Sequence, residues 1–233
     1  MQICICDDDR AMHNEIKKLL TEYGAELTFK ISDKYCGEEL EDGMENCDIV
    51  FLDIEMSGIS GVEAAERLKA KYPDIIIIFV SSYREYISEA FRLEALHFIV
   101  KPIKKEDFKE VFIRALKKYN ENHAFVISTW LNVRHKIPVK EITYIEGYHR
   151  DVTIHTACGK EYKSSGKLSD ILKTVETNGF IQVHQGYIVN MAYIDCVDGN
   201  EIVLTGDIKI PISARKKSAA IKTFDSYIRK WRW

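Results

Sequence analysis

An aspartate, Asp53, directly follows four apolar residues, Ile49-Val50-Phe51-Leu52. Such a run, mostly β-branched or aromatic, indicates a strand that is buried on both faces, as in a parallel sheet. Because desolvating a carboxylate is unfavourable, an aspartate at the end of this strand is expected at the rim of the sheet. Open α/β sheets bind their ligands at the carboxyl ends of their strands. Asp53 is therefore a candidate functional carboxylate.

Three more carboxylates, Asp7-Asp8-Asp9, follow the short apolar strand expected over Gln2–Cys6. Adjacent carboxylates repel one another, so the cluster needs a compensating cation or good solvation. Hard oxygen ligands of this kind suit Mg²⁺. The ordinary structural interpretation is that one of them, Asp9, caps the helix that follows.

Two further buried strands end in polar groups. Ser81 follows Ile75–Val80, and Lys101 with Pro102 follows Leu96–Val100. Taken singly, a serine in this position is more often a helix cap, and a lysine is a solvated cation. The coincidence of polar groups at four strand ends favours one shared site that includes Asp53.

The elements that would position these groups alternate between strand and helix. In the first half, strands are expected at 2–6, 27–31, 49–52, 75–80 and 96–100, and helices at 12–23, 37–46, 62–71, 83–94 and 108–116. Five such alternations predict an α/β fold, a five-stranded parallel sheet that is doubly wound, with helices on both faces.

The second half has a different pattern. Strands are expected at 124–130, 136–139, 143–146, 152–155, 160–163, 180–183, 192–197, 201–204 and 208–210, a helix at 166–176, and a final helix or tail at 215–231. Turn signals at 156–159, 198–200 and 205–207 fit hairpins, so this half is predicted to be mostly β. The helical pattern is expected to stop in the polar run 117–123, which predicts domains at 1–121 and 124–231.

Length and composition agree with two modest domains in 233 residues. The net charge of −3 is uneven, with 24 acidic and 17 basic residues through Asn120, and 12 acidic and 16 basic residues after it. A mildly basic second half is compatible with nucleic acid binding. No apolar run approaches the roughly 20 residues that span a bilayer, and no signal peptide is recognised at the start. The six cysteines form no CxxC pair or zinc spacing, which favours reduced thiols and a cytoplasmic location.

Residues 2–120 resemble the receiver domains of bacterial two-component response regulators. The resemblance rests on the acidic pair after the first strand, aspartate after the third, serine after the fourth, an aromatic residue within the fifth, and Lys-Pro after it. It implies that a sensor histidine kinase transfers a phosphoryl group to Asp53. It also implies a Mg²⁺ site formed by Asp7, Asp8, Asp53 and the backbone carbonyl of Glu55.

Three further roles follow from the same resemblance: Ser81 would receive one phosphoryl oxygen, Lys101 would pair with another, and Phe98 would be the switch aromatic that rotates inward. The chemistry is consistent, because a carboxylate attacks a phosphoryl group only when the repulsion between the two anions is cancelled. Mg²⁺ and a lysine can do this. Ser81 and Phe98 replace a commoner threonine and tyrosine, which are tolerated differences.

Residues 125–230 resemble the LytTR family of DNA-binding domains. The matching segments are Ile142–Glu146, Phe180–Asn190 and Ile210–Arg215. The resemblance implies a β fold whose loops enter successive major grooves of double-stranded DNA. It places the contacts on Arg150 or its neighbour His149, on Gln185, and on Arg215 with Lys216. An arginine can donate two hydrogen bonds to guanine, a glutamine can pair with adenine, and lysines suit phosphates.

Together these features predict a transcription regulator that is controlled by phosphorylation. Phosphorylation of Asp53 would favour a homodimer bound to direct-repeat promoter sites, and the only catalysis would be the receiver's own phosphoryl transfer and dephosphorylation. One alternative is a Mg²⁺-dependent phosphohydrolase with Asp53 as nucleophile and Glu55 as general acid. Another is a receiver joined to a β module that binds protein or RNA.

Overall fold

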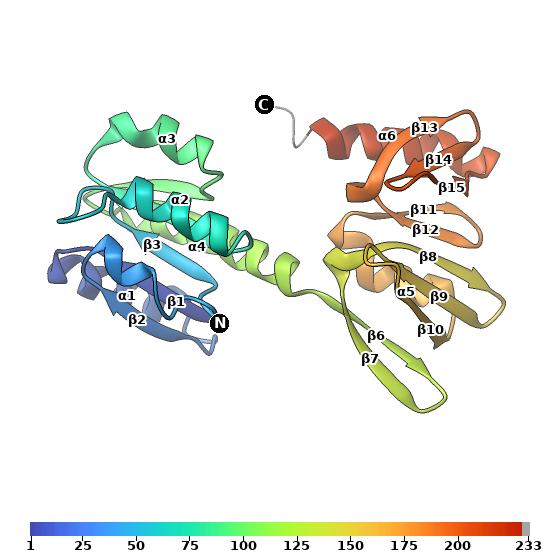
Figure 1. Cartoon of the computed structure of the whole chain (residues 1–233), viewed down its shortest axis with the longest axis horizontal. Coiled ribbons are helices and arrows are strands. Elements are labelled where there is room, and N and C mark those ends of the chain that lie inside the picture. The colour runs from blue at the N-terminus through green and yellow to red at the C-terminus, as the bar shows by residue number, and fades with distance from the viewer. Residues whose placement is uncertain (230–233) are drawn as a thin grey trace. The chain divides into compact units, whose positions relative to one another are not determined.

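The computed structural model describes residues 1–229, which form two units, one over Met1–Asn122 and one that begins at His123 (Figure 1). Lys230 and Trp231, at the end of the predicted second domain, lie outside the described residues. None of the helices within 1–229 is both long enough and apolar enough to cross a membrane.

A parallel five-stranded sheet forms the centre of the first unit, as predicted. Its strands lie in the order β2-β1-β3-β4-β5, with bounds β1 Gln2–Cys6, β2 Lys30–Lys34, β3 Ile49–Leu52, β4 Ile76–Ser81 and β5 His97–Val100. β3 and β4 are buried along their whole length, which explains why both read as uninterrupted apolar runs in the sequence.

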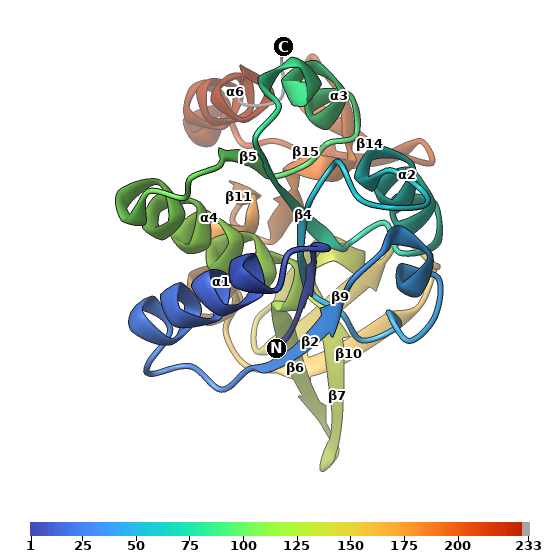
Figure 2. The same cartoon turned by 90° about the vertical axis from the view of Figure 1, so that its left-hand side faces the viewer.

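Helices cover both faces of this sheet (Figure 2). On one face lie α1 (Arg10–Tyr23) and α4 (Lys105–His123), and on the other lie α2 (Gly61–Lys71), α3 (Ile87–Arg92) and a 3₁₀ turn, η1 (Gly37–Leu40). A second 3₁₀ turn, η2 (Arg84–Tyr86), leads into α3. The unit is therefore doubly wound, with a separate apolar core on each side of the sheet.

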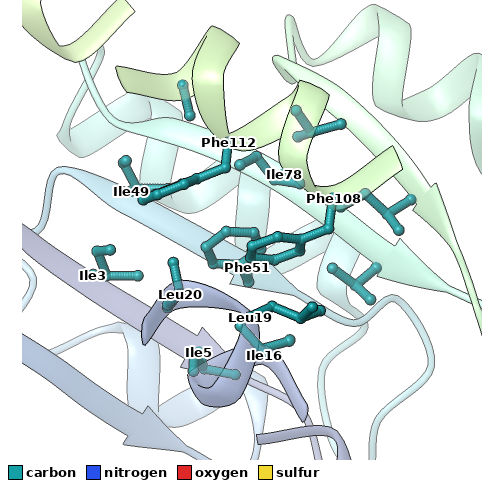
Figure 3. Close-up of a cluster of buried hydrophobic side chains, with 14 of the residues drawn as sticks. Ile3, Ile5, Ile16, Leu19, Leu20, Ile49, Phe51, Ile78, Phe108 and Phe112 are labelled. Carbon is teal, nitrogen blue, oxygen red and sulfur yellow. The ribbon is translucent and has the colours of Figure 1, made fainter. Parts of the chain in front are cut away.

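Alternating side chains of each strand supply these two cores. Ile49 and Phe51 of β3 face α1 and α4, whereas Val50 and Leu52 face the other side. Figure 3 shows the first core, in which Phe51 stacks on Phe108 of α4 with ring centroids 5.5 Å apart. This packing fixes β3, and therefore the residue that follows it, against the helices.

Two elements of the first unit differ most from the sequence prediction. β2 lies three residues later than the predicted strand 27–31, because its parallel register pairs Gln2 with Lys30. The helix predicted at 37–46 is reduced to η1, and Gly43 has a left-handed backbone (φ +77°) that a helix cannot contain. By contrast, α4 ends at His123, within the polar run 117–123 in which the helical pattern is expected to stop, and Tyr119 packs against the first core.

The second unit is mostly β, as predicted, and all its strand pairs are antiparallel. A hairpin of β6 (Phe125–Trp130) and β7 (Val133–Pro138) precedes a five-stranded sheet ordered β10-β9-β8-β12-β11. The bounds of that sheet are β8 Ile142–Tyr148, β9 Asp151–Thr156, β10 Glu161–Ser165, β11 Phe180–His184 and β12 Tyr187–Asn190. A three-stranded sheet follows, with β13 Ile194–Asp198, β14 Glu201–Leu204 and β15 Ile208–Pro211.

Two helices complete this unit, α5 (Leu168–Val175) and α6 (Ala214–Arg229), together with short 3₁₀ turns at Val139–Glu141, Glu176–Asn178 and Met191–Tyr193. One apolar core lies between the five-stranded sheet, α5 and the β6–β7 hairpin. A second lies between the five-stranded sheet, the three-stranded sheet and α6. β12 was not predicted as a strand of its own.

Candidate functional site

The strand ends that the sequence singled out meet at one edge of the parallel sheet. Asp7 follows β1 and Asp53 follows β3, and the Asp53 N–H donates to the Cys6 carbonyl at 2.9 Å. The two carboxylates are almost completely buried, with 1% and 7% of their surface exposed. One carboxylate oxygen from each of Asp7, Asp8 and Asp53 lies within 4.8 Å of the others.

Lys101 joins this cluster from the end of β5. Its Nζ donates to Asp53 Oδ2 at 2.6 Å and to Asp7 Oδ2 at 2.8 Å. Burial opposes the charge of Lys101, but hydrogen bonds and attraction from Asp53 and Asp7 outweigh it, so the pKa of Lys101 is raised. Burial also raises the pKa of Asp7, although Lys101 partly offsets this effect. The lysine thus holds two buried carboxylates together.

The donor set suits a hard divalent cation. Asp7, Asp8 and Asp53 present carboxylate oxygens, the ligand type that Mg²⁺ prefers, and Asp8 is exposed, so an ion held there could keep water ligands. Glu55, whose carbonyl was predicted as a further ligand, lies in the loop after β3 with an exposed side chain. Its carboxylate accepts from the phenol of Tyr83 and raises the pKa of that tyrosine.

The remaining predicted residues of this site lie on the neighbouring strands. Ser81 ends β4 and is fully buried, and its Oγ accepts from the Tyr83 N–H at 3.4 Å. The Lys101 N–H donates to the Ser81 carbonyl at 3.0 Å, which fixes these two strand ends side by side. Phe98 lies opposite Phe79 in the β4–β5 register and is partly buried in the first unit, against the core on the α2 and α3 side of the sheet. The structure therefore places all of them at or beside the same edge.

One residue near this edge was missed by the sequence analysis. His13, on α1, is 2% exposed and its Nε2 lies 2.8 Å from the carbonyl oxygen of Asp7. Its Nδ1 lies 2.8 Å from Asp33 Oδ1, and Asp33 also accepts from Lys17. The one sequence signal was a polar residue on the apolar face of the helix, three residues before Ile16.

A second group of predicted residues gathers at one end of the five-stranded sheet in the second unit. His149 and Arg150 form the turn between β8 and β9, and Gln185 lies in the turn between β11 and β12. The two turns are adjacent, because the Gly147 N–H donates to the Gly186 carbonyl at 2.9 Å. His149, Arg150 and Gln185 are all exposed.

The start of α6 lies at the same end of the sheet. The Ser213 N–H, one residue before the helix, donates to the Val183 carbonyl of β11 at 3.0 Å. Arg215 in the first turn is exposed. The three predicted contact segments, separated by up to 66 positions of sequence between His149 and Arg215, therefore form one surface.

Lys216 is partly buried, whereas its neighbour Arg215 is exposed. Its Nζ donates to Gln182 Oε1 at 2.9 Å, and Gln182 Nε2 donates to the carbonyl of Gln185 at 3.4 Å. Gln182, which the sequence analysis missed, thus connects the first turn of α6 to the β11–β12 turn. Neither its type nor its spacing distinguishes it in the sequence.

Comparison with known proteins matches both units to families. Residues 3–113 match the response regulator receiver domain, and residues 132–224 match the LytTr DNA-binding domain. The sensory transduction protein LytT of Bacillus subtilis is 26% identical over 234 residues, covering 91% of this chain and 94% of that protein. The transcriptional regulatory protein LytR of Staphylococcus aureus is 26% identical over 233 residues, with the same two coverages.

Solved structures resemble the two units separately. The response regulatory domain of protein mrkE from Klebsiella pneumoniae is 22% identical, with a TM-score of 0.48, and covers 52% of this chain and 99% of its own. A LytTr DNA-binding domain from Bacillus cereus is 16% identical, with a TM-score of 0.39, and covers 43% of this chain and 95% of its own.

Proposed function

Because the chain belongs to the response regulators that join a receiver domain to a LytTR DNA-binding domain, we propose that phosphorylation of Asp53 controls sequence-specific DNA binding by the second domain. The observation that carries this proposal is the Lys101 ammonium group held between Asp53 and Asp7 at the rim of the parallel sheet. The proposal takes residues 1–121 as the receiver domain and residues 124–231 as the DNA-binding domain.

In the proposed reaction, a carboxylate oxygen of Asp53 attacks the phosphorus of a phosphohistidine on a sensor kinase. The new P–O bond forms as the P–N bond breaks, and the histidine nitrogen leaves with the bonding electron pair. Mg²⁺, held by Asp7, Asp8, Asp53 and the Glu55 carbonyl, would neutralise charge on the phosphoryl group. Lys101, whose Nζ donates to Asp53 Oδ2 at 2.6 Å, would exchange this hydrogen bond for one to a phosphoryl oxygen.

The switch is proposed to follow from the added charge. Ser81 would donate its hydroxyl to a second phosphoryl oxygen, and Phe98 would move into the space that this serine leaves. Support comes from the shared strand ends, because Ser81 and Lys101 are joined through the backbone and Phe98 lies on the same strand pair. A coupling of about 1–3 kcal/mol would change an output several-fold.

DNA recognition is assigned to the surface formed by the two turns and the start of α6. Arg215 and Gln185 would read base edges, His149 or Arg150 would contribute from the β8–β9 turn, and Lys216 would reach a phosphate. Phosphorylation would promote a homodimer on direct-repeat promoter sites. The protein would act in the cytoplasm, with a sensor histidine kinase as its partner and with no catalysis beyond phosphoryl transfer and dephosphorylation at Asp53.

The test of the receiver chemistry is labelling of the full chain with acetyl phosphate, read by intact mass. The wild-type chain should acquire one phosphoryl group only when Mg²⁺ is present, and the Asp53→Asn variant should acquire none. Labelling of the variant at the wild-type level, or labelling of the wild type without a divalent cation, would refute the assignment.

The test of the DNA-binding surface is selection of duplexes from a random-sequence pool by the phosphorylated chain. Arg215→Ala should weaken binding to the selected duplex by about 1–3 kcal/mol and relax the preference at one position. Lys222→Ala, an exposed lysine two turns further along α6, is the matched control and should change little. Enrichment of RNA in place of duplex DNA in a parallel selection would overturn the proposed target.

A further inference from the structure

The turn between β6 and β7 places an apolar side chain in an unusual position. Leu131 and Asn132 connect the two strands, and both have left-handed backbones, with φ of 48° and 65°. A two-residue hairpin turn of this type favours Asn-Gly or Asp-Gly, since most side chains are unfavourable there. Leu131 nevertheless has 82% of its surface exposed. Neither the conformation of the turn nor packing in a core therefore accounts for a leucine at this position.

The direction of the hairpin connects it to the DNA-contacting surface. Ser128 Oγ of β6 donates to the Lys163 carbonyl of β10 at 2.6 Å, and the next residue, Thr129, donates its N–H to Ser164 Oγ at 3.2 Å. Successive residues of β6 thus meet successive residues of β10, so the two strands run in the same direction. The hairpin tip follows β6, and it therefore lies beyond the C-terminal end of β10.

That end of β10 is also the end that carries the predicted DNA contacts. Ser165, the last residue of β10, pairs with Asp151 at the start of β9, and the Gly166 N–H donates to the Arg150 carbonyl at 2.8 Å. In Figure 1 the hairpin tip, the turn between β8 and β9, the turn between β11 and β12, and the start of α6 all lie on the same side of this unit. The hairpin tip therefore extends the surface that the two turns and the start of α6 form.

The charge of the hairpin is suited to a polyanion. The segment 124–140 contains no aspartate or glutamate, and it contains Arg134, Lys136 and Lys140. Lys136 lies over the Phe125 ring at 4.4 Å. Arg134 is exposed, two residues from the turn, and makes no side-chain hydrogen bond or ion pair among residues 1–229. One free guanidinium group therefore accompanies the exposed leucine and asparagine.

We propose that this tip, formed by Leu131, Asn132 and Arg134, is a further DNA-contacting element that enters a minor groove next to the major grooves read by the other segments. The inference rests on the proposed DNA-binding function. Minor-groove proteins combine arginine and asparagine with an apolar wedge such as leucine, which partly unstacks a base step and bends the duplex. Leu131 is the wedge, Arg134 binds phosphate or the groove floor, and Asn132 contacts base or sugar atoms.

The experiment compares three full-length variants on the duplex that the phosphorylated wild-type chain selects from a random pool. Leu131→Asn removes the wedge but suits the turn, so it should keep the thermal stability of the wild type while affinity falls several-fold and bending of the duplex decreases. Arg134→Ala should reduce the slope of log affinity against log salt by about 1 and shorten the hydroxyl-radical footprint at one end. Lys160→Ala is the control, because this exposed lysine lies just before β10, at the opposite end of the sheet.

Wild-type footprint, bending and salt slope in both tip variants would overturn the inference, while loss of binding in Arg215→Ala would show that the proposed DNA-binding function stands. An equal fall in the salt slope for Lys160→Ala would also overturn it, because the effect would then reflect net charge rather than a contact. If no duplex is enriched by the wild-type chain, the proposed function fails and this inference fails with it.

Discussion

Lys101 is the residue on which the proposed receiver site depends most directly. Its ammonium group pairs with the carboxylates of Asp7 and Asp53, which are buried at the edge of the sheet. Burial of such groups is unfavourable unless they are paired, and removing one partner leaves the others with the full desolvation penalty. The same positive charge that stabilises the free protein would therefore be available to an incoming phosphoryl group.

Lys101→Met should lower the free energy of unfolding of the first unit by about 2 kcal/mol in Mg²⁺-free buffer. This loss is smaller than for an ion pair that is fully buried, because Lys101 still reaches solvent. Mg²⁺ should compensate the same carboxylates, so the difference from wild type should shrink as the ion is added. Urea unfolding with and without Mg²⁺ measures this. Lys105→Met, which removes an exposed pair with Glu22 at 2.9 Å, is the control and should show no Mg²⁺ dependence. A loss for Lys101→Met that Mg²⁺ does not reduce would count against metal binding at this cluster.

His97, at the start of β5, should make the receiver sensitive to mild acid. Burial, and then repulsion from Arg114 of α4, lower the pKa of His97, while Glu110 and Asp107 partly oppose the shift. The unfolded chain therefore binds the proton more readily than the folded chain, so stability should fall as pH drops from about 6.5 towards the lowered folded pKa. Amide hydrogen exchange of β5 at pH 7.5 and 5.5 measures the effect. His97→Gln should remove the His97 contribution, and an identical pH response in the variant would contradict this prediction.

At the scale of elements, Gly61 fixes how closely α2 approaches the end of β3, where Asp53 lies. The helix begins at Gly61, Ser60 caps it by accepting from the Glu63 N–H, and the Gly61 N–H donates to the Ile54 carbonyl at 2.8 Å. A Cβ atom at Gly61 would lie 1.9 Å from the carbonyl oxygen of Asp53. Since the contact is with backbone, either the helix or the loop after β3 must move.

Gly61→Ala should therefore destabilise the receiver by about 1–3 kcal/mol and slow labelling of Asp53 by acetyl phosphate. Gly43→Ala is the matched control, because a Cβ at Gly43 meets nothing within 4 Å although its left-handed backbone (φ +77°) is strained with a side chain. Gly43→Ala should lower stability without changing the labelling rate. Normal labelling of Gly61→Ala would show that the Asp53 loop tolerates movement of α2.

These elements also show how far the sequence alone could lead. The ends of the buried strands could be located, because β3 and β4 are apolar throughout and each stops at a polar residue, Asp53 or Ser81. The helix predicted over 37–46 failed because the left-handed Gly43 is a backbone property that an apolar pattern does not reveal. The contacts of His13 and Gln182 join positions that only the folded chain brings together, so no spacing rule could identify them.

The same limit applies to the second unit. Sequence motifs located the segments that carry Arg150, Gln185 and Arg215, but their assembly on one surface depends on the strand order β9-β8-β12-β11, which short alternating strands do not specify. The roles of these residues in DNA binding remain predictions. The direction of the β6–β7 hairpin also required the structure, since only its hydrogen bonds to β10 show which way it points.

For the whole molecule, the significant feature is the continuous helix between the two units. α4 is anchored in the first receiver core through Phe108, Val111, Phe112 and Ala115, and it continues to His123. One residue, Ala124, separates its end from the first residue of β6. A helix resists bending over this length better than a flexible linker does. We therefore expect a change in the receiver to reach the DNA-binding domain through α4.

Replacing Asn120 and Glu121, which are both exposed, with glycines should weaken this connection. Each glycine destabilises the helix by about 1 kcal/mol relative to alanine, whereas the matched double alanine variant keeps it intact. In the glycine variant, acetyl phosphate should still label Asp53 and the unphosphorylated protein should bind DNA as before, but phosphorylation should raise DNA affinity less than in wild type. Titrations of the selected duplex with and without phosphorylation measure the coupling. Equal coupling in the glycine, alanine and wild-type chains would show that the signal does not depend on helix continuity. Dimerisation of the receiver would then be the route by which phosphorylation changes DNA affinity.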